Sequence, residues 1–273
     1  MYIDILTALA VLVSVSLLLG ILLSLFIRWF GVEEDEKKKK IRDALPGVNC
    51  GACGFKGCND YAEALFKGTA KPNLCIPGAE ATAKELGVIL GVSVEAPEDM
   101  VAFVHCNGTC DATSPRAKYD GVVSCKGSSM FYGGPLSCSY GCLGCGDCAA
   151  VCSVQAICVS NGVARVDTSR CVGCGLCVRE CPKKIISMIP HEAAIVIYCS
   201  SKAKGVDARK ACQNACIGCK KCEKACQNRA ISVTNNCAAI DYTRCTGCGL
   251  CVQGCPTGCL KSVADTPEDC ATT

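Results

Sequence analysis

The chain has 273 residues, a formal net charge of +3 and 30 cysteines, while aromatic residues make up only 5%. The shortage of aromatic residues argues against a large conventional hydrophobic core, and the small net charge gives no reason to expect a nucleic-acid partner. Cysteine at this frequency would indicate a disulfide framework in a short secreted chain, so the location of the chain decides how the cysteines are interpreted.

The first feature along the chain is an apolar stretch from Ile5 to Ile27 that contains no charged residue. It is long enough to cross a bilayer as a helix. A signal peptide is the alternative. However, the residues before the stretch include Asp4 and no basic residue, whereas a signal peptide begins with a positively charged region, and no small-residue cleavage site precedes Arg28. Residues 1–30 are therefore predicted to be a permanent transmembrane anchor in contact with membrane lipid.

The flanks of this stretch predict its orientation. Arg28 and a run of four lysines at 37–40 follow it, within a charged juxtamembrane linker at 31–44, whereas nothing basic precedes it. The positive-inside rule then places the N-terminus outside the cell and everything after residue 28 on the cytoplasmic side of the plasma membrane. Cytoplasmic cysteines stay reduced, which argues against disulfides.

A small domain with four cysteines is predicted at 45–85. The cysteines follow the order C-x2-C-x4-C-x16-C and are Cys50, Cys53, Cys58 and Cys75. Glycines surround the first three, as a chain passing close to a metal cluster requires, and Tyr61 to Lys67 is expected to form a short helix. From the spacing alone, this group fits either an iron–sulfur cluster or a zinc ion.

Residues 86–138 are predicted to be a linker with a short strand at Val101 to Val104. Four further cysteines lie in it and form a candidate site for a sixth cluster: Cys106, Cys110, Cys125 and Cys138. Cys125 and Cys138 also match Cys199 and Cys212 when 74 is added to their numbers. If the candidate site binds a cluster, Cys199 and Cys212 are relics. One alternative is that all six are packing or redox thiols, and another is that Cys138 replaces a ligand of the neighbouring ferredoxin cluster. Cysteines 158, 237, 259 and 270 fall outside every motif and are expected to pack as small apolar residues.

The most informative feature is a duplicated pair of cysteine runs. Each copy has two C-x2-C-x2-C-x3-C runs, and adding 74 to every cysteine number of the first copy gives the second copy. Cys-Pro ends the second run of each copy, as is typical of two-cluster bacterial ferredoxins. The sequence therefore predicts two tandem ferredoxin domains at 139–190 and 213–265, with a connecting segment at 191–212 and a tail at 266–273.

The spacing also predicts the ligands, because in such domains the fourth cysteine of each run ligates the neighbouring [4Fe-4S] cluster. The first domain would hold two clusters on Cys142, Cys145, Cys148 and Cys181, and on Cys171, Cys174, Cys177 and Cys152. The second would hold two on Cys216, Cys219, Cys222 and Cys255, and on Cys245, Cys248, Cys251 and Cys226. Zinc sites rarely show runs of four cysteines. With the four-cysteine domain, this makes five clusters, and six if the Cys106 group binds one.

A β-hairpin is expected between the two runs of each copy. Asn161-Gly162 would turn the chain between strands at 157–159 and 163–166, and Asn235-Asn236 between strands at 231–233 and 238–240. The predicted fold class is thus α+β, built from small cysteine-rich modules.

Basic residues gather between Lys202 and Lys224, where seven lysines and arginines face only two acidic residues. Such an edge would attract an acidic, soluble reduced ferredoxin, although an ordinary solvated surface explains it equally well. The chain has no dinucleotide-binding G-x-G-x-x-G, no P-loop and no recognisable general acid or base. We therefore expect an electron carrier without catalytic residues of its own.

The segment LPGVNCGACGFKGCNDYAEAL, placed between one membrane helix and ferredoxin repeats, resembles the B-subunit family of the Rnf complex, a membrane-bound ferredoxin:NAD oxidoreductase. The resemblance covers the anchor, the four-cysteine domain and the ferredoxin domains, in that order. It implies a cluster in the four-cysteine domain, other membrane subunits as partners, and electrons that pass from ferredoxin toward NAD in a complex that moves ions. The second ferredoxin domain is a departure from the simplest members.

Two alternatives remain for the function. One is a role in a related membrane complex that reduces a redox-sensing transcription factor. The other is a cluster-based redox sensor without electron flow. Five centres in series favour electron transfer, because a sensor does not need them.

Overall fold

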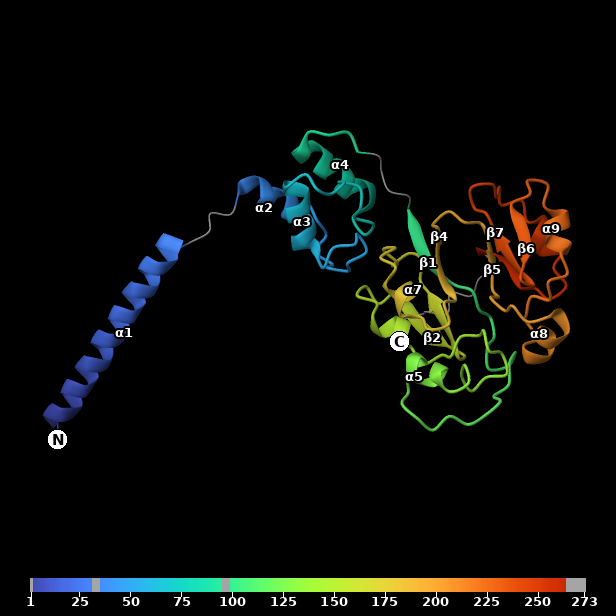
Figure 1. Ribbon diagram of the computed structural model, residues 1–273, viewed down its shortest axis with the longest axis horizontal. Helices are drawn as coiled ribbons and strands as arrows, with labels where there is room; N and C mark the ends of the chain where they lie inside the picture. The colour runs from blue at the N-terminus through green and yellow to red at the C-terminus, as the bar shows by residue number, and fades with distance from the viewer. Residues whose placement is uncertain (1, 31–34, 95–98, 264–273) are drawn as a thin grey trace.

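The structure is a computed structural model that describes residues 2–30, 35–94 and 99–263. Along the chain it contains one long helix, a small helical domain and two modules built from short strands and helical turns (Figure 1).

Helix α1 (Tyr2–Phe30) is the predicted membrane anchor. Its stretch Leu9–Phe26 has a mean hydropathy of 2.7, and none of it is buried against the rest of the chain. At about 1.5 Å per residue, the 29 residues of the helix exceed the ~30 Å hydrocarbon core of a bilayer. The helix is thus long and apolar enough to cross a membrane.

The four-cysteine domain contains α2 (Glu36–Asp43), α3 (Cys58–Phe66) and α4 (Ala79–Leu90). Helix α3 begins before the predicted Tyr61, at Cys58, whose N–H donates to the Asn49 side chain at 2.8 Å. Helix α4 extends into the predicted linker and ends at Gly91, which has a φ of 74°. Ile41, Tyr61 and Leu86 from the three helices form the core of this domain.

The first module contains two antiparallel strand pairs. One joins β1 (Met100–Val104) to β4 (Ile186–Pro190), and the other is the hairpin of β2 (Ile157–Ser160) and β3 (Val163–Val166). The predicted hairpin is confirmed, with Asn161 and Gly162 at φ values of 45° and 78° in the turn. Three short helices lie around the strands: α5 (Cys125–Met130), α6 (Asp147–Ala150) and α7 (Leu176–Glu180).

Strand β1 is the strand predicted at Val101 to Val104, but it is not part of a free linker. It pairs with β4 over its whole length, from Met100 opposite Pro190 to Val104 opposite Ile186. Its side chains alternate between two cores, with Ala102 and Val104 facing the cysteines of the first module and Val101 and Phe103 facing the second module. The strand therefore completes the first module and also joins it to the second.

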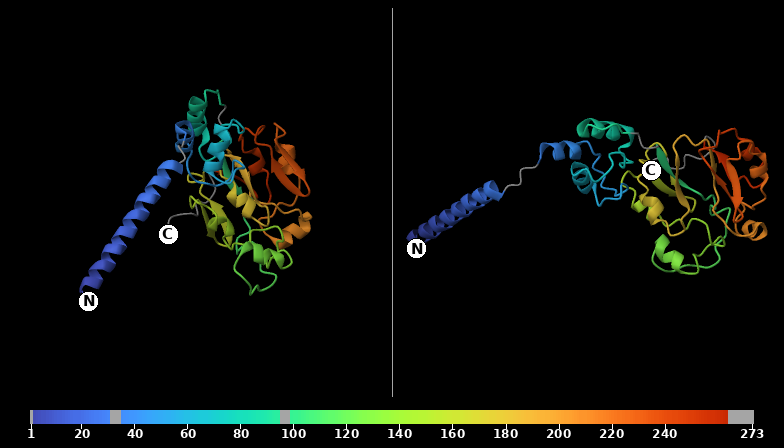
Figure 2. Two further views of the ribbon diagram at one scale, coloured as in Figure 1. Left: turned by 60° about the vertical axis from the view of Figure 1, so that its left-hand side comes forward. Right: turned by 45° about the horizontal axis from the view of Figure 1, so that its top comes forward.

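The second module repeats this plan. Strand β5 (Ile195–Ile197) pairs with β8 (Leu260–Ser262), and β6 (Ile231–Thr234) forms the predicted hairpin with β7 (Cys237–Ile240). Its helices are α8 (Gly205–Ala211), α9 (Lys221–Ala225) and α10 (Leu250–Gln253). The views in Figure 2 show this module beside the first one.

The strand register shows how the two modules correspond. Val104 of β1 lies opposite Ile186, and Ile197 of β5 lies opposite Leu260. Ile186 and Leu260 differ in number by 74, the offset of the cysteine runs, whereas Val104 and Ile197 differ by 93. The first module thus carries an insertion between its leading strand and its first cysteine run, and helix α5 lies in this longer segment.

Aromatic and polar contacts hold the two modules together. The rings of Phe103 and Tyr198 lie edge to face with centroids 5.0 Å apart. His105 bridges the modules because its Nδ1 lies 2.8 Å from the Ile197 carbonyl and its Nε2 lies 2.6 Å from Ser187 Oγ. Burial lowers the pKa of His105, so the neutral imidazole makes these contacts.

Glycines in the cysteine runs provide a test of this packing. Gly144 and Gly175 have φ values of 70° and 69°, so alanine would cost about 1–2 kcal/mol of backbone strain at either position. Only at Gly144 would the new Cβ also lie 2.6 Å from a backbone oxygen, that of Gly162 in the hairpin turn. We expect Gly144→Ala to lower the free energy of unfolding by about 1–3 kcal/mol more than the control Gly175→Ala. Anaerobic thermal unfolding measures the difference, and equal losses would contradict this packing.

Candidate iron–sulfur sites

Site 1 lies in the four-cysteine domain. Burial raises the pKa of the Cys75 thiol, and the nearby thiols of Cys58, Cys50 and Cys53 raise it further. The returning segment is fixed by Tyr61, whose hydroxyl donates to the Lys71 carbonyl at 2.6 Å and accepts the Leu74 N–H at 3.2 Å. The four predicted cysteines are thus brought together at one place.

Site 2 lies in the first module, where Cys142, Cys148 and Cys181 line one pocket. Burial raises the pKa of Cys148 to about 12, and the thiols of Cys142, Cys125 and Cys181 contribute to the rise. Cys145 lies beside Cys125, with a hydrogen bond between the two thiols. Site 2 therefore contains the four predicted cysteines and one more.

Cys125 is the additional thiol, which the sequence pattern grouped with Cys106 and Cys110. Helix α5 carries it to site 2, where its N–H donates to the Asp147 carboxylate at 2.9 Å. It also lines the same space as Cys142. The sequence signal that could have placed it is weak, because α5 lies in the longer segment of the first module.

Site 3 combines the second run of the first module with Cys152. Burial raises the pKa of Cys177 to about 12, and Cys171, Cys174 and Cys152 add to this in that order. Two backbone N–H groups donate to its sulfurs: that of Ala102 in β1 to Cys171 at 3.4 Å, and that of Ala156 to Cys152 at 3.3 Å. The predicted ligand set of this site is therefore assembled.

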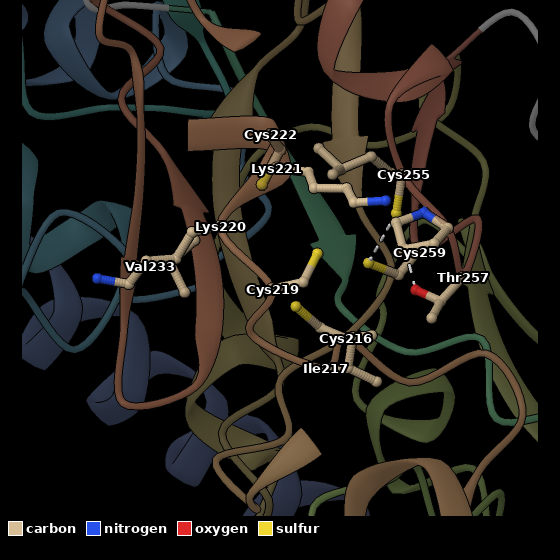
Figure 3. A pocket seen from close by; sticks show the side chains of 12 residues that line it. Cys216, Ile217, Cys219, Lys220, Lys221, Cys222, Val233, Cys255, Thr257 and Cys259 are labelled. Carbon is tan, nitrogen blue, oxygen red and sulfur yellow. Dashed lines mark hydrogen bonds between the residues drawn. The ribbon is translucent and has the colours of Figure 1, made fainter. Parts of the chain in front are cut away.

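Site 4 is the counterpart of site 2 in the second module (Figure 3). Its four predicted cysteines line one pocket: Cys216, Cys219, Cys222 and Cys255. Cys259 also lines it, with its sulfur 3.7 Å from that of Cys255. The exposed Lys220 and Lys221 flank the same space, so this site lies close to solvent.

Site 5 is the counterpart of site 3. Burial raises the pKa of Cys251, and Cys245, Cys248 and Cys226 are close enough to raise it further. The Ala230 N–H donates to Cys226 at 3.3 Å, as Ala156 does to Cys152 in the first module. In both modules, the fourth cysteine of the first run thus lies beside the first three cysteines of the second run.

The donor sets fit a cubane cluster better than a single ion. Within the described part of the chain, no three His, Cys, Asp or Glu side chains converge closely enough to bind one metal ion. A zinc ion would draw four thiolates to about 2.3 Å from one point, whereas the corners of an iron–sulfur cube hold them farther apart. Thiols that face an empty space and accept backbone N–H bonds are what a [4Fe-4S] cluster requires.

The candidate group Cys106, Cys110, Cys125 and Cys138 is not brought together. Cys125 belongs to site 2, and Cys110 is exposed at the turn of the β2–β3 hairpin, where its N–H donates to the Asn161 carbonyl. Cys106 and Cys138 share a cavity with Cys199 and Cys212. The numerical match of Cys125 with Cys199 is therefore coincidental, since the leading strands follow a different offset.

The remaining cysteines differ from the predicted packing role in two ways. Cys158 is disulfide-bonded, which contradicts the expectation that it is a free packing thiol and also the argument against disulfides drawn from the predicted cytoplasmic location. Cys259 is buried as expected, but a hydrogen bond between its thiol and that of Cys255 also lowers the pKa of Cys255 to about 4. The Cys237 thiol donates to the Cys199 carbonyl at 3.3 Å, and its interactions with the Cys199 and Cys216 thiols raise its pKa. Cys270 lies outside the described residues.

Neighbouring sites lie next to one another. Cys50 of site 1 is close enough to Cys174 of site 3 to raise the pKa of that thiol, after the larger effect of burial. Arg179 in α7 secures this contact by donating to the Cys50 carbonyl at 3.1 Å. Within the first module, Cys177 of site 3 lies near Cys148 of site 2.

Comparison with known proteins agrees with this arrangement. A family model described as "Putative Fe-S cluster" matches residues 45–77, which favours a cluster over zinc in that domain. Two models described as "4Fe-4S binding domain" match further segments of the chain, one at residues 164–187 and 238–261 and the other at residues 213–229.

Three curated relatives cover most of the chain. The B subunit of the Na(+)-translocating ferredoxin:NAD(+) oxidoreductase complex of Acetobacterium woodii is 40% identical over 90% of this chain and 74% of its own length. The B subunit of the proton-translocating ferredoxin:NAD(+) oxidoreductase complex of Clostridium ljungdahlii is 39% identical over 93% of this chain and 91% of its own length. The B subunit of the ion-translocating oxidoreductase complex of Methanosarcina acetivorans is 36% identical over 93% of this chain and 97% of its own length.

The Cys259 hydrogen bond predicts a difference between sites 2 and 4. A donor to a cluster ligand stabilises the reduced, more negative cluster, and the first module has Ile185 at the equivalent position. We expect Cys259→Val to lower the potential of the site 4 cluster by about 20–60 mV, which is one hydrogen bond of about 0.5–1.5 kcal/mol expressed for one electron. A redox titration followed by EPR measures the shift, and the unchanged site 2 signal serves as the internal control. No shift at site 4 would contradict this role.

Proposed function

The chain belongs to the B-subunit family of ion-translocating ferredoxin:NAD+ oxidoreductase complexes, and from that premise we propose that it carries electrons from reduced ferredoxin, through [4Fe-4S] clusters in sites 1 to 5, to its partner membrane subunits. The predicted Rnf resemblance is confirmed by the curated relatives. The chain is thus an electron-transfer subunit of an oxidoreductase complex.

The observation that carries this proposal is that thiols of successive sites lie close enough to influence one another electrostatically. Cys50 of site 1 raises the pKa of Cys174 of site 3, and Cys177 of site 3 raises the pKa of Cys148 of site 2, in each case after the larger effect of burial. When bound, the clusters supply the one-electron chemistry. The protein contributes the spacing: α7 holds Cys177 and Arg179 on the same short helix, so one element positions both a site 3 ligand and the contact to site 1.

Site 4 is our candidate for the entry point of ferredoxin. Its Cys219 is exposed, and Lys220 and Lys221 are exposed beside it. Arg209 and Lys210 at the end of α8 add further exposed positive charge to this module. An acidic ferredoxin would be attracted to this edge by complementary charge, which raises the association rate.

The membrane arrangement follows from α1. We propose that α1 spans the plasma membrane once, with its N-terminus outside, so that sites 1 to 5 lie on the cytoplasmic side where soluble ferredoxin is found. The charge asymmetry around the helix supports this, because Arg28 and the lysines at 37–40 all follow the apolar stretch. The same lysines lie in α2, which starts the four-cysteine domain.

Loss of a shared ligand tests the cluster assignment. Cys177→Ala removes a ligand of site 3 beside Cys148 of site 2, so we expect loss of about four irons per chain and an altered EPR signal from the site 2 cluster. Ferredoxin-dependent NAD+ reduction by the assembled complex should fall toward background. Cys110→Ala changes an exposed thiol and is the control. Unchanged iron content in Cys177→Ala would overturn the ligand assignment.

Charge reversal tests the ferredoxin site. The double variant Lys220→Glu with Lys221→Glu should slow reduction by ferredoxin about tenfold at low ionic strength, and high salt should remove the difference. Lys71→Glu, at an exposed lysine of the four-cysteine domain, is the control and should leave the rate nearly unchanged. Stopped-flow mixing measures the rate, and equal slowing in both variants would exclude site 4 as the entry point.

A further inference from the structure

Four cysteines from the two modules line one cavity between them. They are Cys106, Cys138, Cys199 and Cys212. Sites 2 and 4 likewise have cysteines that line one pocket. Cys106 and Cys212 are each only 6% exposed. The four thiols therefore face one another across the contact between the two modules.

Each module contributes the same two positions to this cavity. Cys106 lies just beyond Val104, the end of β1, and Cys199 lies at the same distance beyond Ile197, the end of β5. These strand ends occupy equivalent registers opposite Ile186 and Leu260. Cys138 and Cys212 each precede the first cysteine of the following run by the same spacing, C-x3-C. The duplicated modules therefore present matching pairs of thiols to each other.

Backbone N–H groups point at all four sulfurs. Cys106 accepts from Cys142 at 3.3 Å and from Gly108 at 3.4 Å, and Cys199 accepts from Cys216 at 3.2 Å and from Ser201 at 3.5 Å. The backbone N–H groups of Tyr140 and Gly141 donate to the Cys138 sulfur, and that of Asn214 donates to the Cys212 sulfur. The same type of hydrogen bond is made to Cys152 and Cys171 at site 3.

The segments that carry these cysteines are tied together across the cavity. Thr113 Oγ1 donates to the Ala211 carbonyl at 2.8 Å, and Asn214 Nδ2 donates to the Asn107 carbonyl at 2.8 Å. The Gln213 N–H also donates to the Ala112 carbonyl at 2.8 Å. The residues after β1 are therefore fixed against the end of α8, which holds Cys106 and Cys212 on opposite modules in one arrangement.

We propose that Cys106, Cys138, Cys199 and Cys212 bind a sixth [4Fe-4S] cluster between the two modules. This set replaces the predicted group that included Cys110 and Cys125. A single ion fits less well, because no three ligand side chains in the described part of the chain converge on one point. Four thiols that line one pocket resemble sites 2 and 4, and the backbone N–H donors to their sulfurs resemble those of sites 3 and 5.

The position of this site gives it a role that rests on the proposed electron-transfer function. The N–H of Cys142, a site 2 cysteine, donates to Cys106, and the N–H of Cys216, a site 4 cysteine, donates to Cys199. The sixth site is thus one hydrogen bond away from a ligand of each module. It would connect the first module to the second, so that electrons entering at site 4 reach sites 2, 3 and 1.

The test is iron and acid-labile sulfide content per full-length chain, prepared anaerobically. Six clusters give about 24 irons and five give about 20. We expect Cys138→Ser and Cys212→Ser each to lose about four irons and four sulfides, while Cys110→Ser, an exposed thiol near the same cavity residues in sequence, loses none. If a variant loses more because a module unfolds, the wild-type count decides between the two numbers.

The outcomes separate this inference from the proposed function. About 20 irons in the wild-type chain, or one zinc ion per chain lost in both variants, would overturn the sixth cluster, even if ferredoxin still reduces the others. About 24 irons with a loss of about four in both variants supports it. A chain with the full iron content that ferredoxin cannot reduce would keep the sixth cluster and overturn the electron-transfer proposal.

Discussion

The structure depends on the burial of groups of cysteine thiols within the cores of its modules and its four-cysteine domain. In the first module, Cys142, Cys148 and Cys177 are part of the hydrophobic core. They pack there with aliphatic side chains such as Val104 and Ile186. Burial raises the pKa of these thiols, which opposes the thiolate form that a cluster needs. Cluster binding offsets that cost, so folding and cluster loading are coupled in this chain.

The two modules are copies of one unit, and a few differences between the copies connect them to each other. Their hairpins, cysteine runs and strand pairs correspond, and the differences lie in the insertion after β1 and in single thiols such as Cys259. The longer segment brings Cys125 to site 2 and Thr113 to the end of α8. One segment therefore adds a thiol to one site and fastens the two modules to each other.

Much of this arrangement could be predicted because the cysteine spacing and the turn residues are local signals. The runs, both hairpins and the membrane helix follow from such patterns. The pairing of β1 with β4 could not be predicted, because it joins segments as far apart in sequence as Met100 and Pro190. The same limit explains the incorrect grouping of Cys106 with Cys110 and Cys125. An offset taken from the cysteine runs does not apply to the leading strands, and only the strand register reveals the difference.

Both modules and the four-cysteine domain form one electron path in the proposed function. Its most direct test is rapid mixing of the full-length chain with reduced ferredoxin, followed by freeze-quench EPR. We predict that clusters of the second module are reduced first and those of the first module and site 1 follow, with magnetic coupling between neighbouring reduced centres. The proposed path would be contradicted if electrons stayed in one module and the clusters elsewhere in the chain remained oxidised, although their potentials allow reduction.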